Sequence, residues 1–449
     1  MRLLALALLA AALSPAAPAA EPAEDYRIYT DHPRLFLRPQ RLRLLRRERD
    51  RQSMRWTEFE ALVHGGAQFP EPGFAQALYF ETAADNAAGR RAVEWALGPD
   101  ADMRQIALVF DWCRSLLADA EKARFVDRLE KALDSGPPHD IASARDRVLA
   151  AIAIAEERQD ASERQLQAAI QQWWRSDTAP RLNSGALRFS QADLLPLFEM
   201  INAVRDNLNL DLREDAPEYF QALPAWYVSS FYPATWPGSE NEYRIPSYAG
   251  QAPPDLDASS RARIGGLEMV ACDTNARENQ YVQGWLVLDR YMLRSPYGAP
   301  YEFLWANPYQ PGLAYAGLPL LFYDKSSGAL FVRSGWGDDA AWFGIVGSEF
   351  QLFQDGAVKV LDTGKIAGAA QPLEIGPAAI VAGSRTISAS VDPTFVIGLK
   401  PLTEWNVRAG NRVIRIATTD RAGTLALHDL KPHSSALTLS EHVAPAVPH

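Results

Sequence analysis

Apolar side chains recur three and four positions apart along most of the first 300 residues. The clearest runs span residues 103–133, 141–159 and 190–208, and further runs follow at 258–275 and 278–293. This spacing places the apolar side chains on one face of an α-helix. Ser190 and Asp193 suit the start of the third run, because such side chains accept hydrogen bonds from the free N–H groups of a first helical turn. The pattern therefore predicts amphipathic helices that pack on one another.

After about residue 312 the pattern changes to short runs that alternate or are rich in β-branched residues. Examples are GALFVRSGW (328–336), EFQLFQDGAVKVLD (349–362) and WNVRAGNRVIRIATTD (405–420). The QDG and RAGN breaks inside the last two runs are typical of hairpin turns. The sequence therefore predicts a helical domain over residues 21–311 and an antiparallel β domain over residues 312–449.

The first twenty residues, MRLLALALLAAALSPAAPAA, follow neither pattern. Arg2 precedes a short run of Leu and Ala, and then Pro and small residues, which is the order of a secretory signal peptide cut near Ala20. No apolar run approaches the ~18 residues of a membrane helix. We therefore expect a periplasmic or secreted protein without a membrane span. In such a compartment Cys113 and Cys272 either form one disulfide or remain buried thiols.

The charge balance narrows the choice of partners. A net charge of -10 argues against non-specific binding of nucleic acid. The one basic cluster, residues 34–55, holds nine arginines, and its leucines recur at helical spacing. This cluster is either a solvated helix face or an anion-binding surface.

Aromatic residues are concentrated in one part of the chain. Twelve of the fifteen tyrosines lie between Tyr219 and Tyr323, together with Trp226, Trp236, Trp285 and Trp305. Such a concentration in a loop-rich region favours a cleft lined for stacking on sugar rings, although some of these side chains must also form the domain junction.

Three stretches carry a resemblance to known proteins: DHPRLFLRPQRLRLL (31–45), ALVFDWCRSLL (107–117) and ALFVRSGWGDDAAWF (329–343). They are similar, in order and spacing, to the opening motif, one helix and the first β-domain strand of heparinase II/III-like and related alginate lyases. The resemblance implies an N-terminal incomplete α/α toroid followed by a C-terminal antiparallel β-sandwich. It also implies that an acidic, uronate-containing polysaccharide binds in the groove between them.

The chain departs from that family in its histidines. The family's third motif is followed by a His-rich stretch, whereas this chain reads FGIVGSEFQLFQDGAVKVLDTG (343–364). No histidine lies between residues 140 and 427; the seven are His32, His64, His139, His428, His433, His442 and His449. A zinc site of clustered His and carboxylate is therefore not expected, and neither a metal nor another cofactor is predicted.

The stretch WPGSENEYRIPSYAG (236–250) supplies other groups for uronate chemistry. β-Elimination needs a group that neutralises the carboxylate, a base that removes the neighbouring proton, and an acid for the departing oxygen. Asn241 can hold the carboxylate, Tyr243 can act as acid or base, and Arg244 can lower the tyrosine pKa or pair with the sugar. These three are the predicted catalytic residues, although the same residues suit an ordinary loop at the domain junction.

Further polar and aromatic residues are predicted to bind the substrate. They suit sugar hydroxyls and ring faces, although several also suit helix ends. For Arg333, inside an apolar strand, a structural salt bridge is the alternative. The predicted substrate-binding residues are Trp236, Tyr248, Asn279, Tyr281, Tyr301, Trp305, Asn307, Tyr309 and Arg333.

Two alternative functions remain open. One is a glycan-binding protein that has the lyase fold but no catalysis, as the missing histidines suggest. The other is a glycoside hydrolase that uses two carboxylates, since the chain offers candidates near the same stretch. These acidic residues are Glu240, Glu242, Asp255, Asp257 and Glu302.

Overall fold

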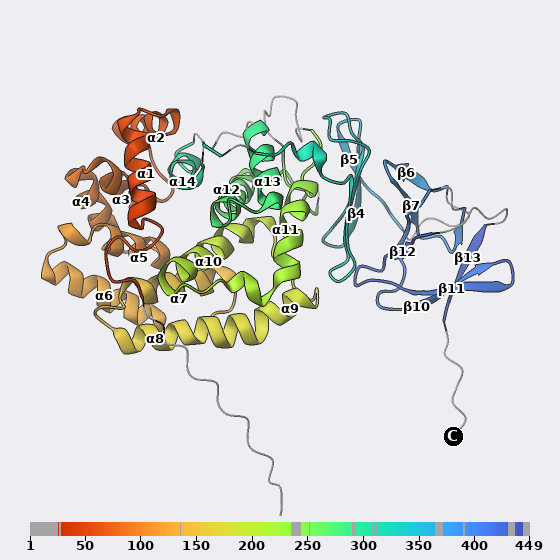
Figure 1. The fold of residues 1–449 in the computed structure, drawn as a ribbon, viewed down its shortest axis with the longest axis horizontal. Helices are drawn as coiled ribbons and strands as arrows, with labels where there is room; N and C mark the ends of the chain where they lie inside the picture. Colours follow the sequence, from red (N-terminus) through yellow and green to blue (C-terminus); the bar gives the residue numbers. More distant parts are fainter. Residues whose placement is uncertain are drawn as a thin grey trace, which may run out of the picture.

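The computed structural model describes residues 26, 28–134, 136–234, 244–250, 252–289, 293, 295–307, 309–310, 312–363, 371–388, 391–429 and 436–442. Helices occupy the N-terminal part and strands the C-terminal part, so the predicted order of helices before strands is confirmed (Figure 1). None of the helices in these ranges is long and apolar enough to cross a membrane.

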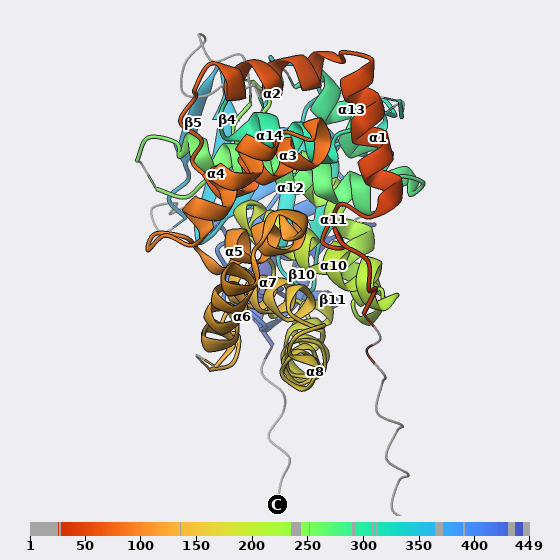
Figure 2. The ribbon, with the colours of Figure 1, turned by 90° about the vertical axis from the view of Figure 1, so that its left-hand side faces the viewer.

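The described residues form fourteen α-helices. Their bounds are α1 (Pro39–Asp50), α2 (Met54–His64), α3 (Pro72–Ala83), α4 (Asn86–Ala96), α5 (Met103–Trp112), α6 (Asp119–Leu133), α7 (Ile141–Ala153), α8 (Gln159–Gln167), α9 (Ala179–Asn183), α10 (Leu194–Leu208), α11 (Pro217–Ser229), α12 (Leu256–Cys272), α13 (Arg277–Leu288) and α14 (Gly298–Trp305). A π-helical stretch, Ala168–Thr178, joins α8 to α9 without a break. α1 and α2 lie at one end of the helical region and α8 at the other (Figures 1 and 2).

The strands form three sheets in the part of the chain that the structure describes. The first has the order β1-β2-β3-β4-β5, the second β12-β9-β7-β6 and the third β11-β10-β13-β8. The bounds are β1 (Leu321–Asp324), β2 (Ala329–Arg333), β3 (Trp342–Val346), β4 (Glu349–Gln354), β5 (Ala357–Val360), β6 (Leu373–Ile375), β7 (Ala378–Ala382), β8 (Thr386–Ile387), β9 (Thr394–Ile397), β10 (Glu404–Ala409), β11 (Arg412–Thr418), β12 (Leu425–Leu427) and β13 (Leu437–Glu441).

The three sheets stack beside the helices as successive layers (Figure 1). Along β2 the side chains alternate: Phe331 packs into the helical core, whereas Leu330 and Val332 face the second sheet. Along β9 Phe395 faces the first sheet and Val396 the third. Because side chains alternate along a strand, the second sheet buries both of its faces.

Several local predictions can be compared with the structure. The QDG break is a hairpin turn between β4 and β5, with Asp355 and Gly356 at positive φ. The run 103–133 divides into α5 and α6, because the carboxylate of Glu121 accepts the backbone N–H of Ala118 and starts a new helix there. The β region is not wholly antiparallel: β7 and β9 pair in parallel, since the connecting chain passes through β8 in another sheet.

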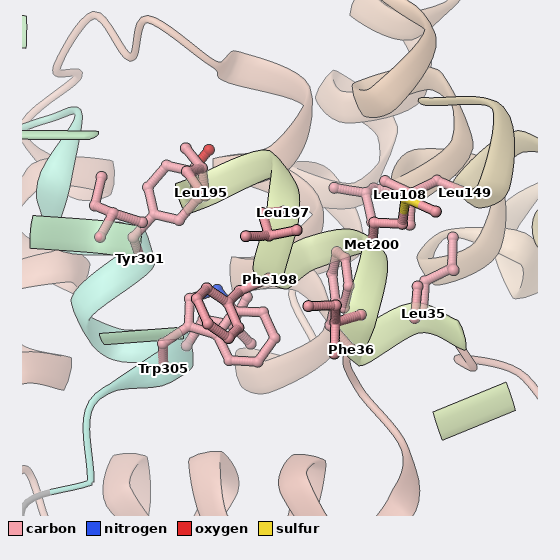
Figure 3. Packing of buried hydrophobic residues seen from close by; sticks show 14 of the residues in the cluster. Leu35, Phe36, Leu108, Leu149, Leu195, Leu197, Phe198, Met200, Tyr301 and Trp305 are labelled. Atoms are coloured by element: carbon pink, nitrogen blue, oxygen red, sulfur yellow. The ribbon is translucent and has the colours of Figure 1, made fainter. Parts of the chain in front are cut away.

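The first two family-like stretches meet in the helical core. The carboxylate of Asp111, fully buried at the end of α5, accepts the backbone N–H groups of Arg34 (2.9 Å) and Leu35 (2.8 Å). It also lies 2.5 Å from Nδ1 of His32. Figure 3 shows Leu35 and Phe36 among side chains of the surrounding helices. The segment HPRLF (32–36), which we call the HPRLF insert, is therefore inserted into the helical core and held there by Asp111.

Charged side chains are also buried between the helices. Glu199 on α10 accepts hydrogen bonds from Arg104 on α5 (2.9 Å) and Arg145 on α7 (2.5 Å). Burial raises the pKa of Glu199, but the two guanidiniums outweigh it and the pKa is lowered. Glu268 on α12 differs: it is fully buried, and neither carboxylate oxygen has a hydrogen-bond partner among the described residues. Burial and the charge of Glu199 hold the pKa of Glu268 well above its ordinary value.

Both cysteines are buried free thiols, so the disulfide alternative is wrong. Burial raises the pKa of both, that of Cys272 to about 11. Neither thiol is therefore a reactive thiolate at neutral pH.

Candidate functional site

A cleft of about 680 Å³ lies where the helices meet the first sheet, and we call it the junction cleft. Its wall comes from the loop between α9 and α10, the segment 245–248, the start of α12, the β1–β2 and β3–β4 turns and the β11–β12 turn. The lining residues are Gly185, Ala186, Arg188, Phe189, Ser190, Gln191, Ala192, Trp226, Ser230, Ile245, Pro246, Ser247, Tyr248, Asp255, Ala258, Ser259, Ser327, Gly328, Ala329, Phe331, Ile345, Val346, Gly347, Arg421 and Ala422.

Glycines allow the turns around the junction cleft to converge. Gly185 has φ +68°, and a Cβ there would lie 2.2 Å from the backbone of Ser326 in the β1–β2 turn. Gly328 has φ +77°, and a Cβ there would lie 2.8 Å from Ala422 in the β11–β12 turn. A side chain at either position would both strain the backbone and push two turns apart.

Arg188 is the cation most firmly held in the junction cleft. Its guanidinium pairs with Asp324 at the end of β1 and donates to Oγ of Ser327 at 2.9 Å. It also lies over the rings of Tyr219 and Trp226, at 5.6 and 5.4 Å. Within the described ranges its Nη1 has no hydrogen-bond partner. The Nη1 atom is buried, and Nε and Nη2 are bonded to Ser327 and Asp324, so the guanidinium is held in one orientation.

Two helix starts add to the positive potential in the junction cleft. α10 and α12 pack together and both begin there. A 3-10 turn, Gln191–Asp193, leads directly into α10, and Ser190 and Asp193 cap the start of this turn, with a hydrogen bond of 2.9 Å from the backbone N–H of Ser190 to the carboxylate of Asp193. Asp255 caps α12 by accepting the N–H of Ala258 at 2.9 Å. The positive dipole ends therefore face the same cleft as Arg188.

Neutral groups complete the wall of the junction cleft. Gln191 donates from Nε2 to Oγ of Ser230, and its buried Oε1 has no partner among the described residues. Arg421 is exposed, and its one hydrogen bond to a described residue is to the carbonyl of Ser184, at 3.3 Å. Amide, hydroxyl, guanidinium and aromatic groups together suit the hydroxyls, carboxylates and flat faces of acidic sugars.

The predicted catalytic residues are only partly visible. Asn241 and Tyr243, together with Trp236, lie outside the described residues. Arg244 is described: its backbone N–H donates to Asp289 at 3.1 Å, and Nε donates to the carbonyl of Pro233 at 2.5 Å. Its guanidinium also pairs with Asp338. In this arrangement Arg244 ties its segment to the protein body.

The predicted substrate-binding residues do not form one group. Tyr248 lines the junction cleft. Asn279 donates to the carbonyls of Met269 and Asp273 at the end of α12, and Tyr281 accepts from Arg277. Tyr301 and Arg333 are buried, and Trp305, Asn307 and Tyr309 lie away from the junction cleft.

Tyr301 is buried and donates to Glu71 at 2.5 Å, so no ring face is open to a sugar. Arg333 is also buried, and its Nη2 donates to backbone carbonyls at the end of α11, including Ser229 at 3.2 Å. Burial lowers the pKa of Arg333 to about 9, and the charge of Arg244 adds to this effect. These contacts fix the first sheet to α11 and involve no carboxylate of the described chain.

Trp305 and Asn307 line a second cleft, away from the sheets. Tyr309 is exposed nearby in sequence and lies 3.5 Å from Nη1 of Arg51. Arg188, Gln191 and Arg421, which do line the junction cleft, were not among the predicted site residues. They occur singly in loops, and only the fold brings them together.

Seven tyrosines in the described part of the chain have a pKa raised chiefly by burial, which is the opposite of what a base requires: Tyr79, Tyr219, Tyr227, Tyr232, Tyr297, Tyr301 and Tyr323. Among the same residues no group of three or more His, Cys, Asp or Glu side chains could hold a metal ion.

No protein-family model matches the chain, and a search of curated proteins found no match.

Proposed function

We propose that this chain is an exported polysaccharide lyase-like protein that acts on an acidic, uronate-containing polysaccharide in the junction cleft. In this proposal the helices form an incomplete α/α toroid and the sheets a β-sandwich, as in the heparinase II/III-like proteins that the sequence resembles. The observation that carries the proposal is Arg188, held over two aromatic rings beside the starts of α10 and α12.

The geometry of the junction cleft supports binding of a charged sugar. Its volume falls within the ~300–1,000 Å³ that is typical of small-molecule sites. Among the described residues Arg188, which is paired with Asp324, and the exposed Arg421 line the cleft together with one carboxylate, Asp255, which is engaged as a helix cap. A sugar carboxylate can therefore pair with Arg421, while Trp226 and Tyr248 offer aromatic surface in the same cleft.

The proposed reaction is a metal-independent β-elimination. A base removes the proton on the carbon next to the uronate carboxylate, a carbon–carbon double bond forms, and the glycosidic carbon–oxygen bond breaks. The departing oxygen then takes a proton. We assign carboxylate binding to Asn241 and proton transfer to Tyr243, both carried by the segment that ends at Arg244.

The test is incubation of the full chain with alginate, heparan-type and pectic uronans, followed at the absorbance of the unsaturated product. We expect product from one class, and loss of product in Tyr243→Phe. Retained oligosaccharide binding by that variant would show that it is folded. Undiminished product in Tyr243→Phe would remove the catalytic assignment.

A second candidate function is glycan binding without catalysis. The observation that favours it is the engagement of Arg244 with Pro233 and Asp338, which leaves this guanidinium for structure rather than for lowering a tyrosine pKa. This candidate predicts saturable binding of acidic oligosaccharides with no turnover. Any cleavage of the polymer by the purified protein would exclude it.

A further inference from the structure

A second cleft, of about 820 Å³, lies between the first half of α1 and the ends of α10, α12 and α14. We call it the arginine groove. It shares no lining residue with the junction cleft. α10 and α12 run between the two, so about 15 residues of helix, roughly 22 Å, separate them. The arginine groove is therefore distinct from the site described above.

Unbalanced positive charge distinguishes this groove. Among the described residues five arginines line it, Arg38, Arg41, Arg43, Arg47 and Arg205, with one carboxylate, Asp206. The chain as a whole carries a net charge of -10. A local excess of about four positive charges on such a protein concentrates anions at one place.

Part of this charge has a structural role. Arg205 donates to the carbonyl of Cys272 at the end of α12 and pairs with Asp206, at 3.2 Å. Arg38 donates to the carbonyl of Asp206 at 2.5 Å. Cations at helix C-termini satisfy free carbonyls and the negative dipole end. These contacts account for two of the five arginines.

Arg41 has a similar role at the end of α14: it donates to the carbonyl of Leu304 at 3.2 Å, and it lies 4.4 Å from the ring centre of Trp305. The remaining two, Arg43 and Arg47, are exposed, and no described residue forms a hydrogen bond or ion pair with either side chain. Stacking on Trp305 fixes the plane of the Arg41 guanidinium before any ligand arrives.

The same helix shows what an ordinary solvated face looks like. Arg46 and Arg49, also on α1, pair with Glu81 at 3.4 Å and Asp50 at 2.6 Å. Arg43 and Arg47 instead form a like-charged pair at i,i+4, which disfavours the helix unless an anion lies between them. The unneutralised arginines of α1 are therefore those that line the groove.

We propose that the arginine groove binds the carboxylate or sulfate groups of an acidic polysaccharide, as a second glycan contact remote from the junction cleft. The identity of the polymer rests on the proposed function; the presence of an anion site does not. Asn307 and Gln40 in the wall supply amide groups for sugar hydroxyls. Two contacts on one protein make long chains bind more tightly than short ones.

The test compares two double charge reversals in the full chain. Arg43→Glu with Arg47→Glu changes the groove, and Arg124→Glu with Lys131→Glu changes the net charge equally on exposed positions of α6. Binding to heparan sulfate, polygalacturonate and alginate is measured at several salt concentrations, with dextran as the neutral polymer. We expect the groove variant to lose about tenfold in affinity for one acidic polymer and part of its salt dependence, and the control to lose little.

The inference is overturned by equal losses in both variants, by no loss in the groove variant, or by wild-type binding to duplex DNA or phosphatidylserine vesicles that exceeds binding to every glycan. Short uronate oligosaccharides separate this inference from the proposed function. If they bind the groove variant normally and yield product, the junction cleft is intact. If acidic polymers bind through the groove but no product forms, the lyase proposal is wrong while the groove inference stands. No binding of any acidic polymer by the wild type would overturn both.

Discussion

The buried carboxyl of Glu268 should give the protein a pH-dependent stability that Glu268→Gln removes. The native state keeps the proton because burial and the charge of Glu199 raise the pKa, whereas the unfolded chain releases it above its ordinary pKa of 4.5. The unfolded state then binds fewer protons, so the free energy of unfolding falls as the pH rises. Each pH unit above 4.5 in which the native carboxyl stays protonated costs about 1.4 kcal/mol.

Glutamine has nearly the same shape but cannot ionise. Its amide adds a cost of about 1–3 kcal/mol for buried donors, which does not change with pH. The informative quantity is therefore the slope of the free energy of unfolding against pH. Between pH 5.5 and 6.5 the free energy of unfolding of the variant should rise by about 1.4 kcal/mol relative to that of the wild type.

The assay is urea denaturation of both proteins at several pH values, with Asp257→Asn, an exposed carboxyl on the same helix, as the control. Parallel pH profiles for the wild type and Glu268→Gln would refute the reasoning, since they would mean that the native carboxyl ionises as freely as the unfolded one.

The other predictions concern the HPRLF insert and the junction cleft. Asp111→Ala leaves two buried N–H groups unpaired and should lower the free energy of unfolding by about 3–5 kcal/mol; a loss below ~1 kcal/mol in denaturation would contradict the role of this carboxylate. Gly185→Ala should lower the melting temperature more than Gly66→Ala. Both glycines have positive φ, but a Cβ at Gly185 would clash with Ser326, whereas a Cβ at Gly66 would meet open space; equal melting temperatures would contradict this. Arg188→Met should weaken binding of a uronate oligosaccharide about tenfold in calorimetry, and unchanged affinity would remove this residue from the site.

Local patterns predicted the elements well because their causes are local. The 3.6-residue period marked the helices, and Ser190 with Asp193 marked the start of α10 through bonds between neighbours in sequence. The QDG turn was equally local, since its shape depends on the positive φ of two neighbouring residues, Asp355 and Gly356. The parallel pairing of β7 with β9 is not local, because it depends on β8 joining a different sheet.

The candidate site could be predicted less well, because composition does not report burial. Tyr301 and Tyr248 come from the same aromatic-rich part of the chain, yet one lies in the core and the other lines the junction cleft. Arg188 and Arg421 carry no pattern of their own, and they line the same cleft only because turns far apart in sequence converge there.

Residues of the three stretches that resemble the lyase family make structural contacts between elements. Asp111 holds the HPRLF insert, and Arg333 and Trp342 fix the first sheet to α11; Nε1 of Trp342 donates to the carbonyl of Ser229 at 2.9 Å. These residues therefore hold the elements of the fold together.

The first sheet packs against the helices on one face and against the second sheet on the other, and this arrangement affects the cooperativity of unfolding. On one face Trp342 meets the ring of Tyr232 edge-on and Phe353 stacks on it, while Phe343 and Leu352 on the other face pack against the strands that follow. A fragment that ends near residue 311 would leave the end of α11 without these rings and without Arg333. The helical and β regions should therefore unfold in one cooperative transition, and neither should be obtained as a stable piece by limited proteolysis between them.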